Sequence, residues 1–97
     1  MTQVDMVAVD DLVREIARAL VDEPGAVDVQ SVQRDENTVL RLRVAPGDVG
    51  KVIGKQGRTA RSLRTILGAA SMKYHRRFAL DIVEADDDPD AQDHAEP

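Results

Sequence analysis

Glycines and a proline divide residues 46–71 into two helices of unequal length, and this punctuation constrains the fold more than any other feature. A short helix is predicted from Pro46 to Ile53, because proline suits a first helical turn and the apolar residues recur at helical spacing. The stretch "GKQG" at residues 54–57 then interrupts the pattern, since glycine costs a helix interior about 1 kcal/mol relative to alanine. The chain is therefore predicted to turn sharply between two helices.

The second of these helices, "RTARSLRTILGAAS" at residues 58–71, has the clearest periodicity in the chain. Its predicted inward positions are Ala60, Leu63, Ile66, Leu67 and Ala70. Arginines at positions 58, 61 and 64 recur every three residues and are predicted to point outward. A solvated helix face is the alternative interpretation of this basic stripe.

An amphipathic helix is also predicted near the N-terminus, in "AVDDLVREIARALVDEPG". Its expected inward residues are Leu12, Val13, Ile16, Ala17 and Leu20. Asp10 or Asp11 is expected to cap its first turn, and Pro24 prevents its continuation.

Alternating apolar residues predict the strands. The patterns at residues 37–45 and 76–84 each indicate one buried face. Residues 26–33 predict a less regular strand, because Val32 is out of phase with the other valines, and a β-bulge is one alternative there. The following residues, "RDEN", suit a hairpin turn. The order helix, strand, strand, helix, helix, strand predicts a two-layer α+β domain with three helices on one face of a three-stranded sheet.

The size and composition favour a binding module. A chain of 97 residues fits one domain and has little apolar surface to spare for a deep catalytic pocket. It has no cysteine, which excludes thiolate metal sites and cysteine nucleophiles. No apolar run approaches the roughly 20 residues that span a bilayer, so we expect a cytoplasmic protein without a membrane partner.

The charge distribution matters more than the net charge of -5. Residues 51–77 hold eight bases and no acid, whereas residues 78–97 hold eight acids and no base. Because exposed charges are screened over about 8 Å at physiological ionic strength, a ligand at the basic segment experiences mainly that segment. A polyanionic partner is therefore compatible with this acidic chain.

The glycine turn has the chemistry of a phosphate contact. Backbone N–H groups at a helix start lack internal partners and attract anions. Gly54 and Gly57 can adopt positive φ and let a sugar-phosphate backbone approach without a Cβ in the way. A G-x-x-G turn alone more often marks only a tight corner between helices, and the surrounding cations are what favour a binding role here.

Other functional patterns are absent from the sequence. Neither the mononucleotide loop G-x-x-x-x-G-K-[ST] nor G-x-G-x-x-G occurs. His75 has no acid or nucleophile at a telling spacing, and the acids after Asp86 lack the glycine and glutamate of a calcium loop. We expect no enzyme activity, no metal and no cofactor.

The segment "GKVIGKQGRTARSLRTIL" at residues 50–67 resembles the helix, G-x-x-G loop and helix of KH domains. With its element order, the chain resembles the bacterial type II KH fold, αββααβ, and most closely the small KH proteins of the KhpA type. The resemblance covers residues 8–84 and leaves residues 1–7 as an N-terminal extension. Residues 85–97, acidic and almost without apolar residues, are expected to form a disordered tail.

This resemblance implies that about four nucleotides of single-stranded RNA lie in a cleft beside the loop. Carried onto this sequence, it assigns the nucleic-acid backbone to Gly54, Lys55, Gln56 and Gly57, supporting charge to Lys51, Arg58 and Arg61, and an aliphatic floor for the bases to Val52, Ile53, Leu63 and Val44. Ala60 departs from the family pattern, in which many domains have a larger aliphatic residue, so the shape of the groove is left open.

The resemblance further implies a role as an RNA chaperone or post-transcriptional regulator. It also implies a homodimer, or a heterodimer with a larger KH protein of the KhpB type. The alternative function is a dimerisation scaffold in which the KH fold serves protein contact and RNA contact is incidental.

Overall fold

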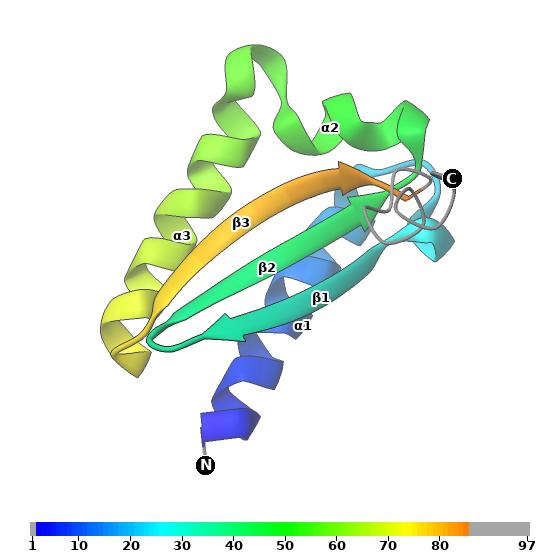
Figure 1. The fold of residues 1–97 in the computed structure, drawn as a ribbon. Helices are drawn as coiled ribbons and strands as arrows, with labels where there is room; N and C mark the ends of the chain where they lie inside the picture. The colour runs from blue at the N-terminus through cyan, green and yellow to red at the C-terminus, as the bar shows by residue number, and fades with distance from the viewer. Residues whose placement is uncertain (1, 86–97) are drawn as a thin grey trace, which may run out of the picture.

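The computed structural model describes residues 2–85 and confirms the predicted order of elements (Figure 1). The elements are α1 (Thr2–Leu20), β1 (Asp28–Arg34), β2 (Asn37–Val44), α2 (Val49–Ile53), α3 (Arg58–Tyr74) and β3 (Arg77–Glu84). Short 3-10 turns precede β1, α2 and α3. The predicted acidic tail lies outside the described residues from position 86 onward.

The three strands form one sheet in the order β1-β2-β3. β1 and β2 are an antiparallel hairpin, whereas β2 and β3 run parallel. Parallel neighbours need a crossover connection, and α2 with α3 provides it. The pairing of β1 with β2 is one-to-one from Asp28 to Arg34, so the alternative of a β-bulge at Val32 does not occur.

One face of the sheet holds the core, and the three helices cover that face (Figure 1). Along β2, the inward side chains Thr38, Leu40, Leu42 and Val44 have no exposed area. The side chains between them are half-buried on the other face. The two-layer α+β architecture predicted from the sequence is confirmed.

Helix α1 differs from its prediction at both its start and its buried face. It begins at Thr2, so the expectation that Asp10 or Asp11 caps its first turn is wrong, because both lie well inside the helix. Its fully buried residues are Val9, Val13 and Ala17, while Leu12, predicted to be inward, is 43% exposed. Of the five residues predicted to be inward, Val13 and Ala17 are buried as predicted, and the partly buried Ile16 packs against the core.

Helix α3 packs as predicted through Ala60, Leu63 and Leu67, but Ile66 is 44% exposed. The helix ends at His75, whose left-handed φ of 54° turns the chain into β3. Ser71 joins the two elements, because its Oγ donates to Leu67 O at 2.9 Å and accepts from Phe78 N at 3.0 Å.

A buried carboxylate holds the start of α2 in place. Asp48 is 3% exposed and accepts hydrogen bonds from the backbone amides of Asp22, at 3.2 Å, and Glu23, at 3.0 Å. The ammonium of Lys51 lies 3.9 Å from the same carboxylate. The chain after α1 is thereby anchored to the helix that precedes the glycine turn.

Candidate nucleic-acid interface

The turn between α2 and α3 requires glycine at its first position. Gly54 has φ 80° and ψ 169°, a conformation that is essentially restricted to glycine. A Cβ there would lie 2.3 Å from Thr59 Oγ1 and 2.9 Å from Thr59 N. Close approach of the turn to the first turn of α3 therefore depends on a residue without a side chain.

The tip of the turn exposes two main-chain donors. Gln56 and Gly57 have φ of 58° and 73°, which reverses the chain direction within three residues. Gly54 N donates to Gly50 O at 2.8 Å and Gly57 N donates to Gly54 O at 3.0 Å. The amides of Lys55 and Gln56 donate no hydrogen bond to any residue in 2–85, and both residues are exposed. The donors offered to a ligand are therefore those of the two middle residues.

The cations near the turn divide into paired and unpaired groups. Lys51 Nζ lies 3.3 Å from Asp22 Oδ2, so carboxylates of the chain itself offset its charge. Arg58 donates to Gln56 Oε1 at 3.1 Å and stiffens the tip. Within the described part of the chain, Lys55, Arg58 and Arg61 have no carboxylate partner. Of the four cations predicted for the site, these three have no carboxylate partner among the described residues, whereas Lys51 is paired with Asp22 and Asp48.

A groove of about 540 Å³ adjoins the turn, between α3 and the edge strand β3. Its lining residues are Ile53, Gly57, Ala60, Arg61, Arg64, Asp81 and Ile82. Small residues on the helix keep it open, two arginines give it positive charge, and aliphatic side chains from α2 and β3 give it an apolar base. This combination suits a ligand with apolar faces and anionic groups.

The predicted aliphatic floor is largely wrong. Val44 and Val52 have no exposed area and Leu63 is 4% exposed, so these side chains belong to the core and offer no surface to a base. Ile53, at 37%, is the one member of the predicted floor that reaches the groove. The physical reason is the topology, because β2 is the central strand and β3 lies at the edge beside α3.

Three groove residues were missed, namely Arg64, Asp81 and Ile82, while Ala60 had been connected only to the shape of the groove. The signal for them was present in the sequence. A crossover through two helices returns the next strand alongside the first, and the alternation of "RFALDIVE" places Ile82 on the inward side of that strand. Ile82 therefore takes the position that had been assigned to Val44.

A comparison with protein families identifies the domain. The family described as "KhpA/KhpB, KH domain" matches residues 10–82, which contain all six elements except the first part of α1 and the end of β3. The chain belongs to the KhpA/KhpB KH-domain family. The αββααβ order and the three-stranded sheet are those of the type II KH fold, as predicted.

Curated relatives of this KH domain match most of the chain and nearly all of their own length. The protein named "RNA-binding protein KhpA" of Treponema pallidum is 51% identical over 75 residues, covering 77% of this chain and 94% of the relative. Proteins of the same name from Caldanaerobacter subterraneus and Aquifex aeolicus are each 47% identical, covering 75% and 81% of this chain and 97% and 100% of the relatives. The names of these relatives describe RNA binding.

Solved structures share the KH fold at low sequence identity. A crystal structure of Era in complex with MgGDPNP and nucleotides 1506–1542 of 16S ribosomal RNA has a TM-score of 0.53 at 18% identity. The match covers 78% of this chain but only 29% of that protein, so it supports the fold alone. Among residues 2–85, no helix is long and apolar enough to span a bilayer, and no cluster of metal-ligating side chains occurs.

Proposed function

We propose that this KH domain binds single-stranded RNA, with about four nucleotides lying along the turn and the adjoining groove. The observation that carries the proposal is the turn at residues 54–57, whose two exposed middle residues have unpartnered amides near Lys55, Arg58 and Arg61. Phosphates would contact the amides and the cations, while bases would lie against Ile53 and the small residues of α3. The names of the relatives support the same ligand class.

Two expectations follow for the mode of binding. Contacts between the turn and the sugar-phosphate backbone of RNA give modest sequence selectivity, because phosphate and sugar groups are common to all nucleotides. The domain is therefore suited to act on many RNAs, as an RNA chaperone or post-transcriptional regulator. A single site of this size binds weakly, and association of two domains would raise the effective concentration.

The test replaces both tip residues by aspartate, Lys55→Asp with Gln56→Asp. Aspartate tolerates the left-handed conformation of position 56, so the fold should survive while phosphate contact becomes repulsive. The matched control is Arg18→Asp with Gln30→Asp, which makes the same charge change at exposed positions on α1 and β1. Fluorescence anisotropy with a short single-stranded RNA should show loss of binding only for the tip variant.

Salt dependence provides the second readout. If three to four phosphates are neutralised, log K should fall against log salt concentration with a slope of about -2 to -3, at about 0.7 per phosphate. The tip variant should have a shallower slope. Equal RNA affinity for the tip variant and its control, or a wild-type slope near zero, would reject the proposal.

A dimerisation scaffold is the second candidate, and the exposed outer face of α3 favours it. Ile66 is 44% exposed on that face, away from the groove. A second copy, or a KH protein of the KhpB type, would cover it. Ile66→Glu should then abolish self-association in analytical ultracentrifugation or capture of that partner, whereas an RNA-binding role alone predicts no change in either.

A further inference from the structure

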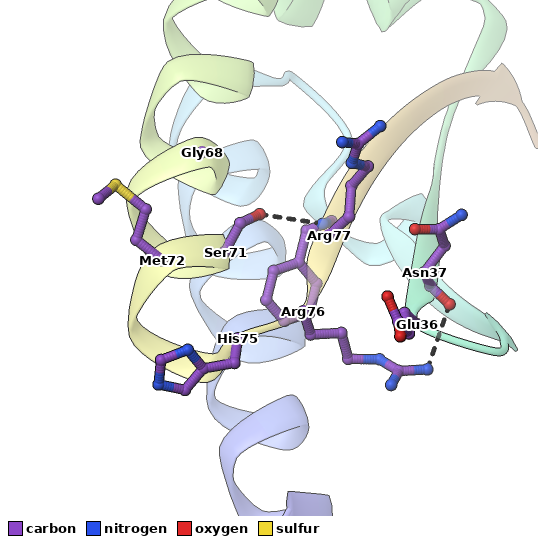
Figure 2. A pocket seen from close by; sticks show the side chains of 9 residues that line it. Glu36, Asn37, Gly68, Ser71, Met72, His75, Arg76 and Arg77 are labelled. Carbon is purple, nitrogen blue, oxygen red and sulfur yellow. Dashed lines mark hydrogen bonds between the residues drawn. The ribbon is translucent and has the colours of Figure 1, made fainter.

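A second hollow, of about 530 Å³, lies at the opposite end of α3 from the glycine turn. It is enclosed by the last turns of α3, the β1–β2 hairpin and the first residues of β3 (Figure 2). Figure 2 shows Gly68 and Ser71 on α3 beside Arg77 of β3. None of the residues predicted for the RNA site lines this hollow.

The two hollows share one face of α3. The groove near the turn is lined by positions 57, 60, 61 and 64, and the second hollow by positions 68, 71, 72 and 75. The six of these positions that lie within α3, namely 60, 61, 64, 68, 71 and 72, fall within about a third of the helix circumference at 100° per residue, and Gly57 and His75 flank the two ends of the helix. The same side of the helix therefore borders both hollows.

Strand β3 continues the same arrangement. It contributes Arg77 and Phe78 to the second hollow and Asp81 and Ile82 to the groove. Residues four apart in a strand point to the same side and lie about 13 Å apart. The two hollows therefore lie one beyond the other along α3 and the edge strand β3, and we call the surface that includes both of them the trough.

Arg64 crosses the trough between the two hollows. Its guanidinium donates to Leu80 O of β3 at 3.2 Å, so it reaches from the helix to the edge strand. From Arg61 to Met72, α3 rises about 16 Å. A strand occupying both ends therefore passes over Arg64 and extends well beyond the part of the trough nearest the turn.

The second hollow offers an unpaired arginine and an apolar surface to a nucleotide, and Glu36 is the one acidic residue in its lining. Arg77 is exposed, and its guanidinium has no hydrogen-bond or ion-pair partner in residues 2–85. Arg76 differs, because it donates to Thr38 Oγ1 and to Asn37 O and so serves the hairpin. Met72, at 79% exposed, gives a large apolar contact surface beside these cations.

Gly68 leaves the helix side of the second hollow without a side chain. It lies in the interior of α3, where glycine costs about 1 kcal/mol relative to alanine. Packing within the domain does not require a glycine at this position, since a Cβ there would meet no atom within 4 Å. What the glycine does provide is bare helix backbone where the second hollow begins.

We propose that the second hollow is a further nucleotide-binding subsite, so that single-stranded RNA runs from the glycine turn along the trough to Arg77. The inference rests on the proposed RNA-binding function and extends its site from about four to about six to eight nucleotides, within the range of about 4 to 16 known for single-strand grooves. Arg77 would contact a phosphate, and a base would lie against Met72 above Gly68.

The test measures anisotropy with uridine oligomers of four, six and eight nucleotides for five proteins, namely the wild type, two variants and two controls. The variants are Arg77→Glu, which reverses the charge, and Gly68→Leu, which fills the trough and favours the helix. Their controls are Arg18→Glu and Ala69→Leu, the latter placing the same leucine on the neighbouring exposed position outside the trough. Thermal unfolding of each variant confirms the fold.

Both variants should bind the tetramer as the wild type does and bind the octamer about tenfold more weakly, as expected for loss of one contacted nucleotide. Longer oligomers also offer more binding registers, but that gain is equal in all the proteins and cancels in the comparison. In NMR spectra, the octamer should shift the Met72 methyl and Gly68 amide signals, and the tetramer should not.

The outcomes separate this inference from the proposed function. If the wild type binds no oligomer, the proposed function fails. If it binds the tetramer, but Arg77→Glu and Gly68→Leu leave octamer affinity at the level of their controls, the second subsite is overturned and RNA binding stands. The latter result would favour a protein partner as the ligand of the second hollow.

Discussion

Replacement of Gly54 by alanine tests whether the conformation of the turn is as constrained as the structure indicates. The residue has φ 80° and ψ 169°, where a residue with a side chain is strained by about 1–3 kcal/mol. Its Cβ would also lie 2.3 Å from Thr59 Oγ1, 2.7 Å from Thr59 Cβ and 2.9 Å from Thr59 N. The backbone nitrogen cannot withdraw without moving the first turn of α3.

The free energy of unfolding should therefore fall by about 3–4 kcal/mol. This value adds the conformational strain to an overpacking cost of about 1–3 kcal/mol and subtracts about 0.4–1 kcal/mol for the stiffer unfolded chain. Gly57→Ala is the matched control, because Gly57 also has positive φ, of 73°, but its Cβ would meet nothing within 4 Å. It should cost only about 1–2 kcal/mol.

Urea denaturation followed by circular dichroism measures both variants. A difference of about 2 kcal/mol corresponds to about 8–16 °C in melting temperature for a domain of this size. Thr59→Ala combined with Gly54→Ala should recover part of the loss, since it removes the Oγ1 contact and leaves the Cβ and backbone contacts. Equal stability of the two single alanine variants would refute the reasoning.

Two further predictions concern buried polar groups. Asp48→Ala should lower the free energy of unfolding by about 2–4 kcal/mol in urea denaturation, because two backbone amides lose their acceptor, and Asp48→Asn should cost less. A smaller loss for alanine than for asparagine would contradict this. Arg76→Ala should cost about 1–3 kcal/mol by leaving the buried Thr38 hydroxyl unpaired, and adding Thr38→Val should recover most of the loss in thermal unfolding. No recovery would assign the loss to Asn37 instead.

The element order was predictable because each element carries a local periodicity. What the periodicity did not determine was which residues face the sheet. In α1, Leu12 lies next to Val13 on the helix, and packing against β1 selected the line through Val13. The start of α1 was also missed, since two aspartates suitable as caps were taken as the beginning of a helix that continues through them.

The turn was predicted more accurately than the groove, and the difference has a physical cause. Positive φ at Gly54 and Gly57 follows from the chemistry of single residues, which is visible in a sequence. The groove depends on which strand lies at the sheet edge, and that is a property of the whole topology. Val44 is apolar and near the turn in sequence, but the parallel pairing of β3 with β2 separates it from the groove.

The structure also explains how an acidic chain can present a basic surface. Arg14 lies 2.6 Å from Asp11 and Arg18 lies 3.4 Å from Glu15, so cations on α1 are matched within their own helix. On α3 the spacing of three residues brings arginine next to arginine, and no acid occurs in that helix to offset them. Exposed charges are screened over about 8 Å at physiological ionic strength, so we expect acids on the solvent side of α1 to offset the arginines of α3 less than acids within α3 would. Arg18→Glu changes the net charge by as much as Arg77→Glu does, and only position in the fold distinguishes their expected effects on RNA.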